Sequence, residues 1–144
     1  LVLAGREDFF YKKVKKDIKN KEISKNIIFF GEANDDELKL LYKNAKALVV
    51  PSLMEGFGLT ALEALSLGCL VIASDIPSIS EVCQDSAIYF NPEEIYDIKE
   101  KIKMVYNLEE KEKLIALGLK RSKVFSWDKM VDETIKVYES CIGL

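Results

Sequence analysis

Short runs of consecutive apolar residues recur along the chain and predict buried strands. Within each run the apolar side chains follow one another instead of alternating with polar ones. Strands that are covered on both faces show this pattern, which is typical of parallel sheets. The runs occupy residues 1–4, 27–30, 47–50, 70–73 and 87–90.

Apolar residues at helical spacing separate these runs. The predicted helices are marked by Phe10, Val14 and Ile18, by Leu38, Leu41 and Ala45, and by the segments 58–67 and 78–84. Alternation of strand and helix indicates βαβ units with right-handed crossovers. We therefore predict the α/β class: a Rossmann-like three-layer αβα sandwich around a parallel sheet, with residues 1–144 forming a single domain.

Only helices are predicted after the last strand. Their stripes are Ile95, Ile98, Ile102 and Val105, then Leu114 and Leu117, then Met130, Thr134, Val137, Tyr138 and Cys141. Ser126 would cap the last helix, and Trp127 is expected to anchor it in the core. Its apolar stripe could instead dock onto another domain, and the sequence leaves both arrangements open.

Composition narrows the functional classes. The net charge is −3, with 21 basic and 24 acidic residues mixed along the chain, so no overall positive field favours nucleic acid or anionic lipid. No apolar run approaches the roughly 20 residues of a membrane helix. The absence of histidine excludes His-based catalysis and His metal sites within this chain.

The cysteines suggest a reducing compartment. Cys69, Cys83 and Cys141 are sparse, odd in number and without CxxC spacing, so buried, inert thiols in a cytoplasmic protein are expected. The chain opens on a strand-like run without an initial Met, and we expect it to be a piece of a longer protein.

The loop after the third predicted strand carries the candidate chemistry. Ligands of open α/β sheets bind at the carboxyl ends of the strands. Here Gly56 and Gly58 allow a tight turn into the following helix. The free N–H groups at that helix start would favour a phosphate or pyrophosphate.

Two glutamates flank this turn. Glu63 is the only ionisable residue of the segment 58–67, so its carboxylate needs donors. Ribose hydroxyls would supply them, but Thr60 and Glu63 also fit a capping box, and the pattern leaves both readings open. Glu55 would accept hydrogen bonds from sugar hydroxyls or stabilise positive charge at an anomeric carbon. A solvated loop acid is its alternative.

The segment from Glu55 to Glu63 resembles the E-x7-E motif of family 4 (group 1) retaining glycosyltransferases, which have the GT-B fold of two Rossmann-like domains. The likeness extends over nearly the whole chain. It includes Phe29-Phe30-Gly31, Ala47 to Ser52, Gly68 to Ser74, Ser80-Glu81-Val82, Tyr89 to Pro92 and Phe125-Ser126-Trp127. By this resemblance the chain is the C-terminal domain, without its first strand and without the N-terminal acceptor domain.

The resemblance implies a role for each motif residue. Glu55 is the catalytic residue against the transferred sugar, and Glu63 binds the ribose. Gly56, Phe57, Gly58, Leu59 and Thr60 contact the rest of the donor, while Gly31, Glu32 and Ala33 lie against the base. Glu81 is a further candidate. The reaction implied is transfer of a hexose, with retention, from a UDP-, GDP- or ADP-linked sugar to a glycan or lipid-linked acceptor, without metal or other cofactor.

The sequence departs from this family at two points. Thr60 stands where Pro is usual, and the basic pair for the pyrophosphate would precede residue 1. The isolated chain is therefore expected to be inactive. A regulatory nucleotide-binding domain or a scaffold on the same fold are the rival hypotheses.

Three further segments contain acidic residues that could serve a ligand site, but local structure explains them better. Residues 34–37 could form a divalent-metal cluster, but a helix N-cap with acids in the first turn explains them better. Ser78 and Glu81 fit a capping box by spacing. Asp75 is expected to be a turn residue.

Overall fold

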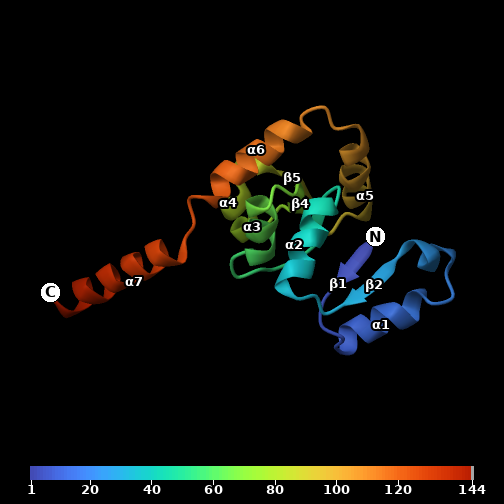
Figure 1. The fold of residues 1–144 in the computed structure, drawn as a ribbon, viewed down its shortest axis with the longest axis horizontal. Helices are drawn as coiled ribbons and strands as arrows, with labels where there is room; N and C mark the ends of the chain where they lie inside the picture. Colours follow the sequence, from blue (N-terminus) through green and yellow to red (C-terminus); the bar gives the residue numbers. More distant parts are fainter. Residues whose placement is uncertain (144) are drawn as a thin grey trace. The chain divides into compact units, whose positions relative to one another are not determined.

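The computed structural model describes residues 1–143 and shows strands and helices in alternation (Figure 1). The strands are β1 (Val2–Ala4), β2 (Ile28–Gly31), β3 (Leu48–Val50), β4 (Val71–Ser74) and β5 (Ala87–Phe90). The α-helices are α1 (Phe9–Ile18), α2 (Asp35–Asn44), α3 (Leu59–Ser66), α4 (Pro77–Cys83), α5 (Ile95–Met104), α6 (Lys111–Ser122) and α7 (Trp127–Ile142). Short 3-10 helices cover Glu22–Asn26, Gln84–Ser86 and Val105–Asn107.

The apolar runs predicted the strands to within one residue at either end. All strand pairs are parallel, as expected: β1 pairs with β2, and β4 pairs with both β3 and β5. Each predicted helix is also present. The α/β class is therefore confirmed in the pattern of elements and in the direction of the strands.

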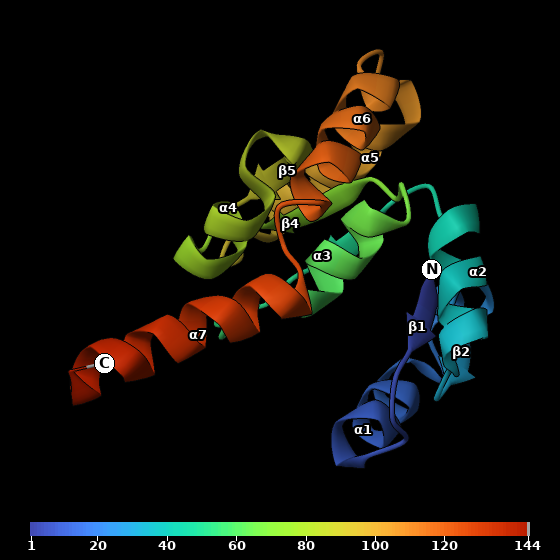
Figure 2. The ribbon, with the colours of Figure 1, turned by 60° about the vertical axis from the view of Figure 1, so that its left-hand side comes forward.

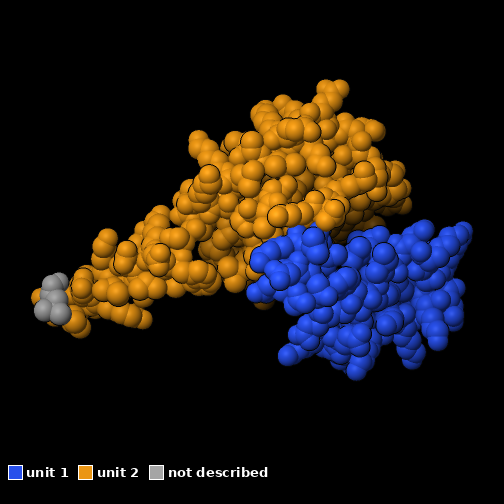
Figure 3. All heavy atoms as spheres, viewed as in Figure 1, with its two compact units in different colours: residues 1–41 blue, residues 42–144 orange. Residues whose placement is uncertain are grey.

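The described chain forms two compact units, residues 1–41 and residues 42–144, coloured separately in Figure 3. The strands follow the same division. They form a two-stranded sheet in the first unit and a three-stranded sheet, in the order β3-β4-β5, in the second. The strands that we expected in one sheet thus pair as two separate sheets.

The second unit has a core on both faces of its sheet. Leu70, Ile72, Ile88 and Phe90 pack together with Val105. Since strand residues alternate between faces, Val71 and Ala73 of β4 point to the opposite side, where they are also fully buried. A central strand buried on both faces explains the continuous apolar run at 70–73.

Helix α6 packs closely on α3, the helix that follows the motif loop. A Cβ at Gly118 of α6 would stand 2.7 Å from Leu65 Cδ2 of α3, a distance that real Cβ atoms do not adopt. Leu65 is only 1% exposed, so it has little room to move. Glycine at 118 therefore permits the approach that holds α3 in place.

Helix α7 projects from the rest of its unit in Figures 1 and 2. Ser126 caps it as predicted, since its Oγ accepts a hydrogen bond from the Lys129 backbone N–H at 3.1 Å. Trp127 was expected to be a core anchor, and this is wrong: the side chain is 72% exposed. The helix buries none of its residues, because no described element covers its apolar face.

Two further core assignments need correction. Cys69 and Cys83 are buried as expected, whereas Cys141 on α7 is exposed. On α1, Phe10 is 70% exposed, and Tyr11 packs edge-on against Phe29 of β2 instead, with ring centroids 5.3 Å apart. Among the described residues, no helix is long and apolar enough to cross a membrane.

The contact between α6 and α3 makes a prediction about Gly118→Ala. Alanine in an exposed helix is favoured over glycine by about 1 kcal/mol. At position 118 the overlap with Leu65 should outweigh this preference, so the substitution should lower the free energy of unfolding by about 1–3 kcal/mol, measured by urea unfolding. Leu65→Ala should make the added methyl group much less costly. Stabilisation by Gly118→Ala in the parent would contradict the packing argument.

Candidate functional site

The loop after β3 enters α3 through a left-handed turn at Gly58. This residue is the N-cap of α3, with φ 99° and ψ 40°, and its carbonyl accepts the N–H of Leu62. Glycine is the residue type that adopts this conformation without strain. Gly56 was also expected to need such freedom, but it lies outside the left-handed region.

The start of α3 is open to a ligand. No side chain caps the helix there, and the N–H groups of a first turn have no intrahelical acceptor. Leu59 and Thr60 of this turn are exposed. The arrangement combines free donors with the positive end of the helix dipole, which together favour an anion.

The capping box proposed for Thr60 and Glu63 is wrong. Because Gly58 is the N-cap, Ala61 occupies the third helical position, and Glu63 lies too far along the helix to reach back. The Glu63 carboxylate instead accepts a hydrogen bond from the Tyr42 hydroxyl at 3.2 Å. Glu63 is otherwise exposed, so its carboxylate keeps acceptor capacity for a ligand.

Tyr42 supplies this hydrogen bond from the end of α2. It is 8% exposed, and its burial raises the pKa of its hydroxyl to about 12, with the negative charge of Glu63 and their hydrogen bond adding to the effect. The phenol therefore stays protonated at neutral pH and acts as a permanent donor. It orients Glu63 without neutralising it.

Glu55 is oriented in a similar way. The Ser52 hydroxyl donates to Glu55 Oε1 at 2.8 Å across the loop, and both residues are half-buried. The two motif glutamates thus each have one side-chain donor from within the second unit. Each retains free lone pairs, which suits them to accept hydroxyl groups of a ligand.

Gly31 ends β2 in the first unit with φ 83°, and its carbonyl accepts the N–H of Gly5 at 2.8 Å. Glu32 is exposed and Ala33 half-buried. Gly31 itself is buried, and Glu32 and Ala33 follow the end of β2, so the base-binding role that the family resemblance implies for 31–33 stays a prediction.

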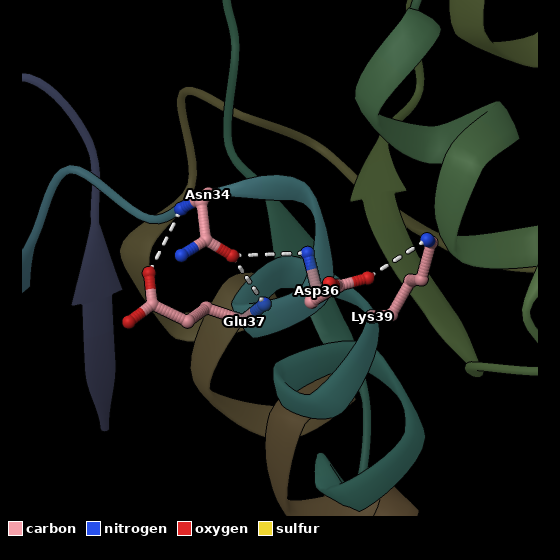
Figure 4. Close-up of polar contacts among 4 residues, drawn as sticks. All are labelled: Asn34, Asp36, Glu37 and Lys39. Atoms are coloured by element: carbon pink, nitrogen blue, oxygen red, sulfur yellow. Dashed lines mark hydrogen bonds and ion pairs between the residues drawn. The ribbon is translucent and has the colours of Figure 1, made fainter.

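The acidic segment that follows is a helix cap, as predicted (Figure 4). Asn34 Oδ1 accepts the N–H groups of Asp36 and Glu37, and the Glu37 carboxylate accepts the Asn34 N–H at 2.9 Å. Asp36 pairs with Lys39. In residues 1–143, no three His, Cys, Asp or Glu side chains gather closely enough to hold a metal ion.

The segment around α4 differs from its prediction. The N-cap is Ile76 and Pro77 begins the helix, so Ser78 and Glu81 form no capping box. Ser80 instead donates to Asp75 Oδ1 at 2.9 Å, and Asp75 lies in the turn after β4 as expected. The Glu81 side chain is exposed.

A pocket of about 470 Å³ lies at the ends of β4 and β5. It is lined by Asp75, Tyr89, Phe90, Asn91, Pro92 and Asp97. Burial is the main cause that raises the pKa of Tyr89 well above its ordinary value, and its hydroxyl donates to the Gln84 carbonyl at 2.7 Å. The pocket does not include either motif glutamate.

The family of the chain follows from the match of its sequence to a family model. The model for group 1 glycosyl transferases matches residues 1–118. The chain belongs to this family. Its match includes the β3–α3 loop and both glutamates, as well as Gly31 and the residues after it.

Curated relatives agree with this assignment. O-antigen chain mannosyltransferase B from Escherichia coli is 35% identical over 116 residues, covering 78% of this chain and 30% of that protein. The O-antigen chain mannosyltransferase RfbU from Salmonella typhimurium is 35% identical over 108 residues, covering 75% of this chain and 30% of that protein. The chain thus spans less than a third of the length of either relative.

Solved structures confirm the fold. Sucrose-phosphate synthase from Thermosynechococcus elongatus superposes with a TM-score of 0.87 at 22% identity, over 99% of this chain and 38% of that one. A glycosyltransferase from Rickettsia africae superposes with a TM-score of 0.84 at 21% identity, over 98% of this chain and 39% of that one. The predicted Rossmann-like α/β fold, which GT-B glycosyltransferases share, is confirmed at this level.

Two of the observed contacts were missed by the sequence reasoning. Tyr42 and Ser52 orient the two glutamates, but neither lies within the E-x7-E segment. Ser52 is three residues from Glu55 and could have been found from its spacing. Tyr42 is 21 residues from Glu63, and no local pattern marks it.

Tyr42→Phe tests the hydrogen bond to Glu63 through its pH dependence. The folded-state pKa of Tyr42, about 12, exceeds the ordinary value of 10.0, so the protonated phenol stabilises the fold below about pH 10. This contribution disappears as the pH rises through about 12. Unfolding free energies measured between pH 9 and 12 should therefore fall less steeply in Tyr42→Phe than in the parent.

The control is Tyr96→Phe, which changes a 77% exposed tyrosine on α5. In this variant the free energy of unfolding should fall with pH as steeply as in the parent. Equal slopes for the parent and Tyr42→Phe would refute the environment assigned to Tyr42.

Proposed function

We propose that this chain is the donor-binding part of a retaining glycosyltransferase that transfers a hexose from a nucleotide sugar to a glycan or lipid-linked acceptor. The observation that carries the proposal is the β3–α3 segment. It has an uncapped helix start after a left-handed Gly58, flanked by two glutamates that side-chain donors orient. Membership of the group 1 family places this segment in a glycosyltransferase sequence.

The proposed roles follow from the chemistry of each group. The backbone N–H groups of Phe57, Gly58 and Leu59 would meet the phosphates, with Gly56 and Thr60 beside them. Glu63, held by Tyr42, would accept the ribose hydroxyls. Glu55, held by Ser52, would contact hydroxyls of the transferred sugar and stabilise positive charge at its anomeric carbon.

The rest of the donor would be held outside this segment. We propose that the base lies against the backbone of Gly31, Glu32 and Ala33, and that Glu81 is a further donor contact. Backbone dipoles and basic side chains would neutralise the departing nucleoside diphosphate, so no metal or other cofactor is proposed. The free thiols fit a reducing cytoplasm as the place of the reaction.

The acceptor would bind to a part of the whole protein that precedes this chain. The coverage of only 30% of each relative supports this view. In the first unit, β1 pairs with β2 along one of its two edges. We propose that a preceding strand of the same domain pairs with the other edge of β1. The exposed apolar face of α7 would pack on the preceding domain.

Mannose is the sugar that the relatives favour. Both relatives named above are described as O-antigen mannosyltransferases. A mannose donor and a role in cell-surface polysaccharide assembly are therefore our first choice. UDP-, GDP- and ADP-linked donors all fit the proposed contacts.

Calorimetric titration of the chain with UDP, GDP and ADP tests donor binding. We expect weak binding of one of them and at least a tenfold loss of affinity in Glu63→Gln, because the neutral amide is a poorer acceptor for ribose hydroxyls. Glu112→Gln, an exposed carboxylate change on α6, is the matched control and should bind like the parent. Equal affinity of the Glu63 variant and the parent would exclude the ribose role.

The same titration separates the roles of the glutamates. Glu55→Gln should bind the nucleoside diphosphate with the affinity of the parent, because this ligand lacks the sugar that Glu55 would contact. In the whole protein it should lower the rate of transfer by about 100-fold or more, as the loss of a group that stabilises transition-state charge does. The isolated chain should transfer no sugar.

A further inference from the structure

The motif loop is in contact with the junction between α6 and α7. Phe57, which precedes Gly58, packs edge-on against Phe125, with ring centroids 5.6 Å apart and an angle of 87° between the rings. This is the favoured geometry of an aromatic pair. Phe125 lies beyond residue 118, where the match to the family model ends.

Phe125 is itself held by Arg121, in the last turn of α6. The Arg121 guanidinium lies over the Phe125 ring, 4.7 Å from its centroid. Such a contact is attractive because the face of an aromatic ring is negative, and the attraction is stronger when the pair is desolvated. Phe125 is half-buried, and its ring is thus in contact with Phe57 and with a cation.

The same guanidinium binds the end of α4. Arg121 Nε donates to the Val82 carbonyl at 2.9 Å, and a terminal nitrogen donates to the Glu81 carbonyl at 2.8 Å. Carbonyls in the last turn of a helix have no intrahelical partner and carry the negative end of the dipole. One planar guanidinium satisfies two of them at once, which an ammonium group cannot do with the same geometry.

Helix α4 also lies against the turn of the motif loop. A Cβ at Gly58 would stand 3.5 Å from Ile79 Cγ1, in the middle of α4. The contacts therefore form a closed path from Phe57 to Phe125, from there to Arg121 and α4, and from Ile79 back to Gly58. The loop is supported at two neighbouring residues by groups that are joined to each other.

We propose that Arg121 and Phe125 are positioning residues for the donor site. They fix the loop so that the N–H groups of Phe57, Gly58 and Leu59 are in place before a ligand arrives. This inference rests on the proposed function for its consequence in binding, but the ordering of the loop is a property of the free protein. Preorganised donors bind more tightly because less conformational entropy is lost on binding.

The ordering is measured by ¹⁵N relaxation of the Phe57 and Gly58 amides in the full chain without ligand. We expect order parameters near the ~0.85 of rigid backbone in the parent, falling below ~0.6 in Phe125→Ala. Phe125→Tyr preserves the edge-on pair and should restore the value of the parent. Trp127→Ala deletes a larger but 72% exposed aromatic side chain two residues away and should change nothing.

Arg121→Lys tests the second part of the path. It retains the positive charge but loses the planar group that binds both carbonyls and lies over the ring. We expect an intermediate fall in the order parameters of the loop. Thermal unfolding of every variant checks that it remains folded, and Phe125→Leu replaces Phe125→Ala if the latter does not.

Binding of UDP, GDP or ADP to the same variants separates this proposal from the proposed function. If the parent binds one of them, Phe125→Ala should bind it about tenfold more weakly, and Phe125→Tyr should bind it like the parent. A fall in order parameters, with no nucleotide binding by the parent chain or by the whole protein, would support the positioning role and reject the proposed function. Unchanged order parameters in Phe125→Ala would overturn the positioning role, whatever the affinity does.

Discussion

The site depends on one backbone constraint, the left-handed turn at Gly58. The chain leaves β3, reverses at this residue and enters α3 with no side chain over the helix start. A side chain at this φ of 99° would be strained, which is why glycine is required here. The direction of α3, and with it the place of Glu63, follows from this turn and from the close packing of α6 on α3 at Gly118 and Leu65.

Sequence patterns predicted what is decided locally. Continuous apolar runs predicted the strands, and β4, which is buried on both faces, shows why such a strand must be apolar throughout. The expected burial is wrong for the first unit, where Val2 of β1 is 43% exposed and Ile28 of β2 is 60% exposed. The caps at Asn34 and Ser126 were predicted correctly, since the capping residue lies directly before the helix that it caps. The capping boxes at Thr60 and Ser78 failed because both helices begin earlier, after Gly58 and at Pro77.

The rest of the site depends on contacts between distant residues. Tyr42 reaches Glu63 from another helix, and Arg121 reaches the carbonyls of α4 across 39 and 40 residues of sequence. Periodicity contains no information on such pairs. The burial of Trp127 was predicted wrongly for a related reason: an apolar stripe shows that a helix has a face to cover, but not which element covers it. Family resemblance named the glutamates, and only the structure supplied the groups that orient them.

The most direct test of the account is to map the nucleotide on the chain. Two-dimensional ¹H–¹⁵N NMR spectra recorded during titration with UDP, GDP and ADP would report each amide separately. We predict that the nucleotide that binds shifts the amides of Phe57, Gly58 and Leu59 most strongly, with smaller shifts around Glu63. Shifts confined to the pocket at Asp75 and Asn91, with the amides of 57–59 unmoved, would contradict it.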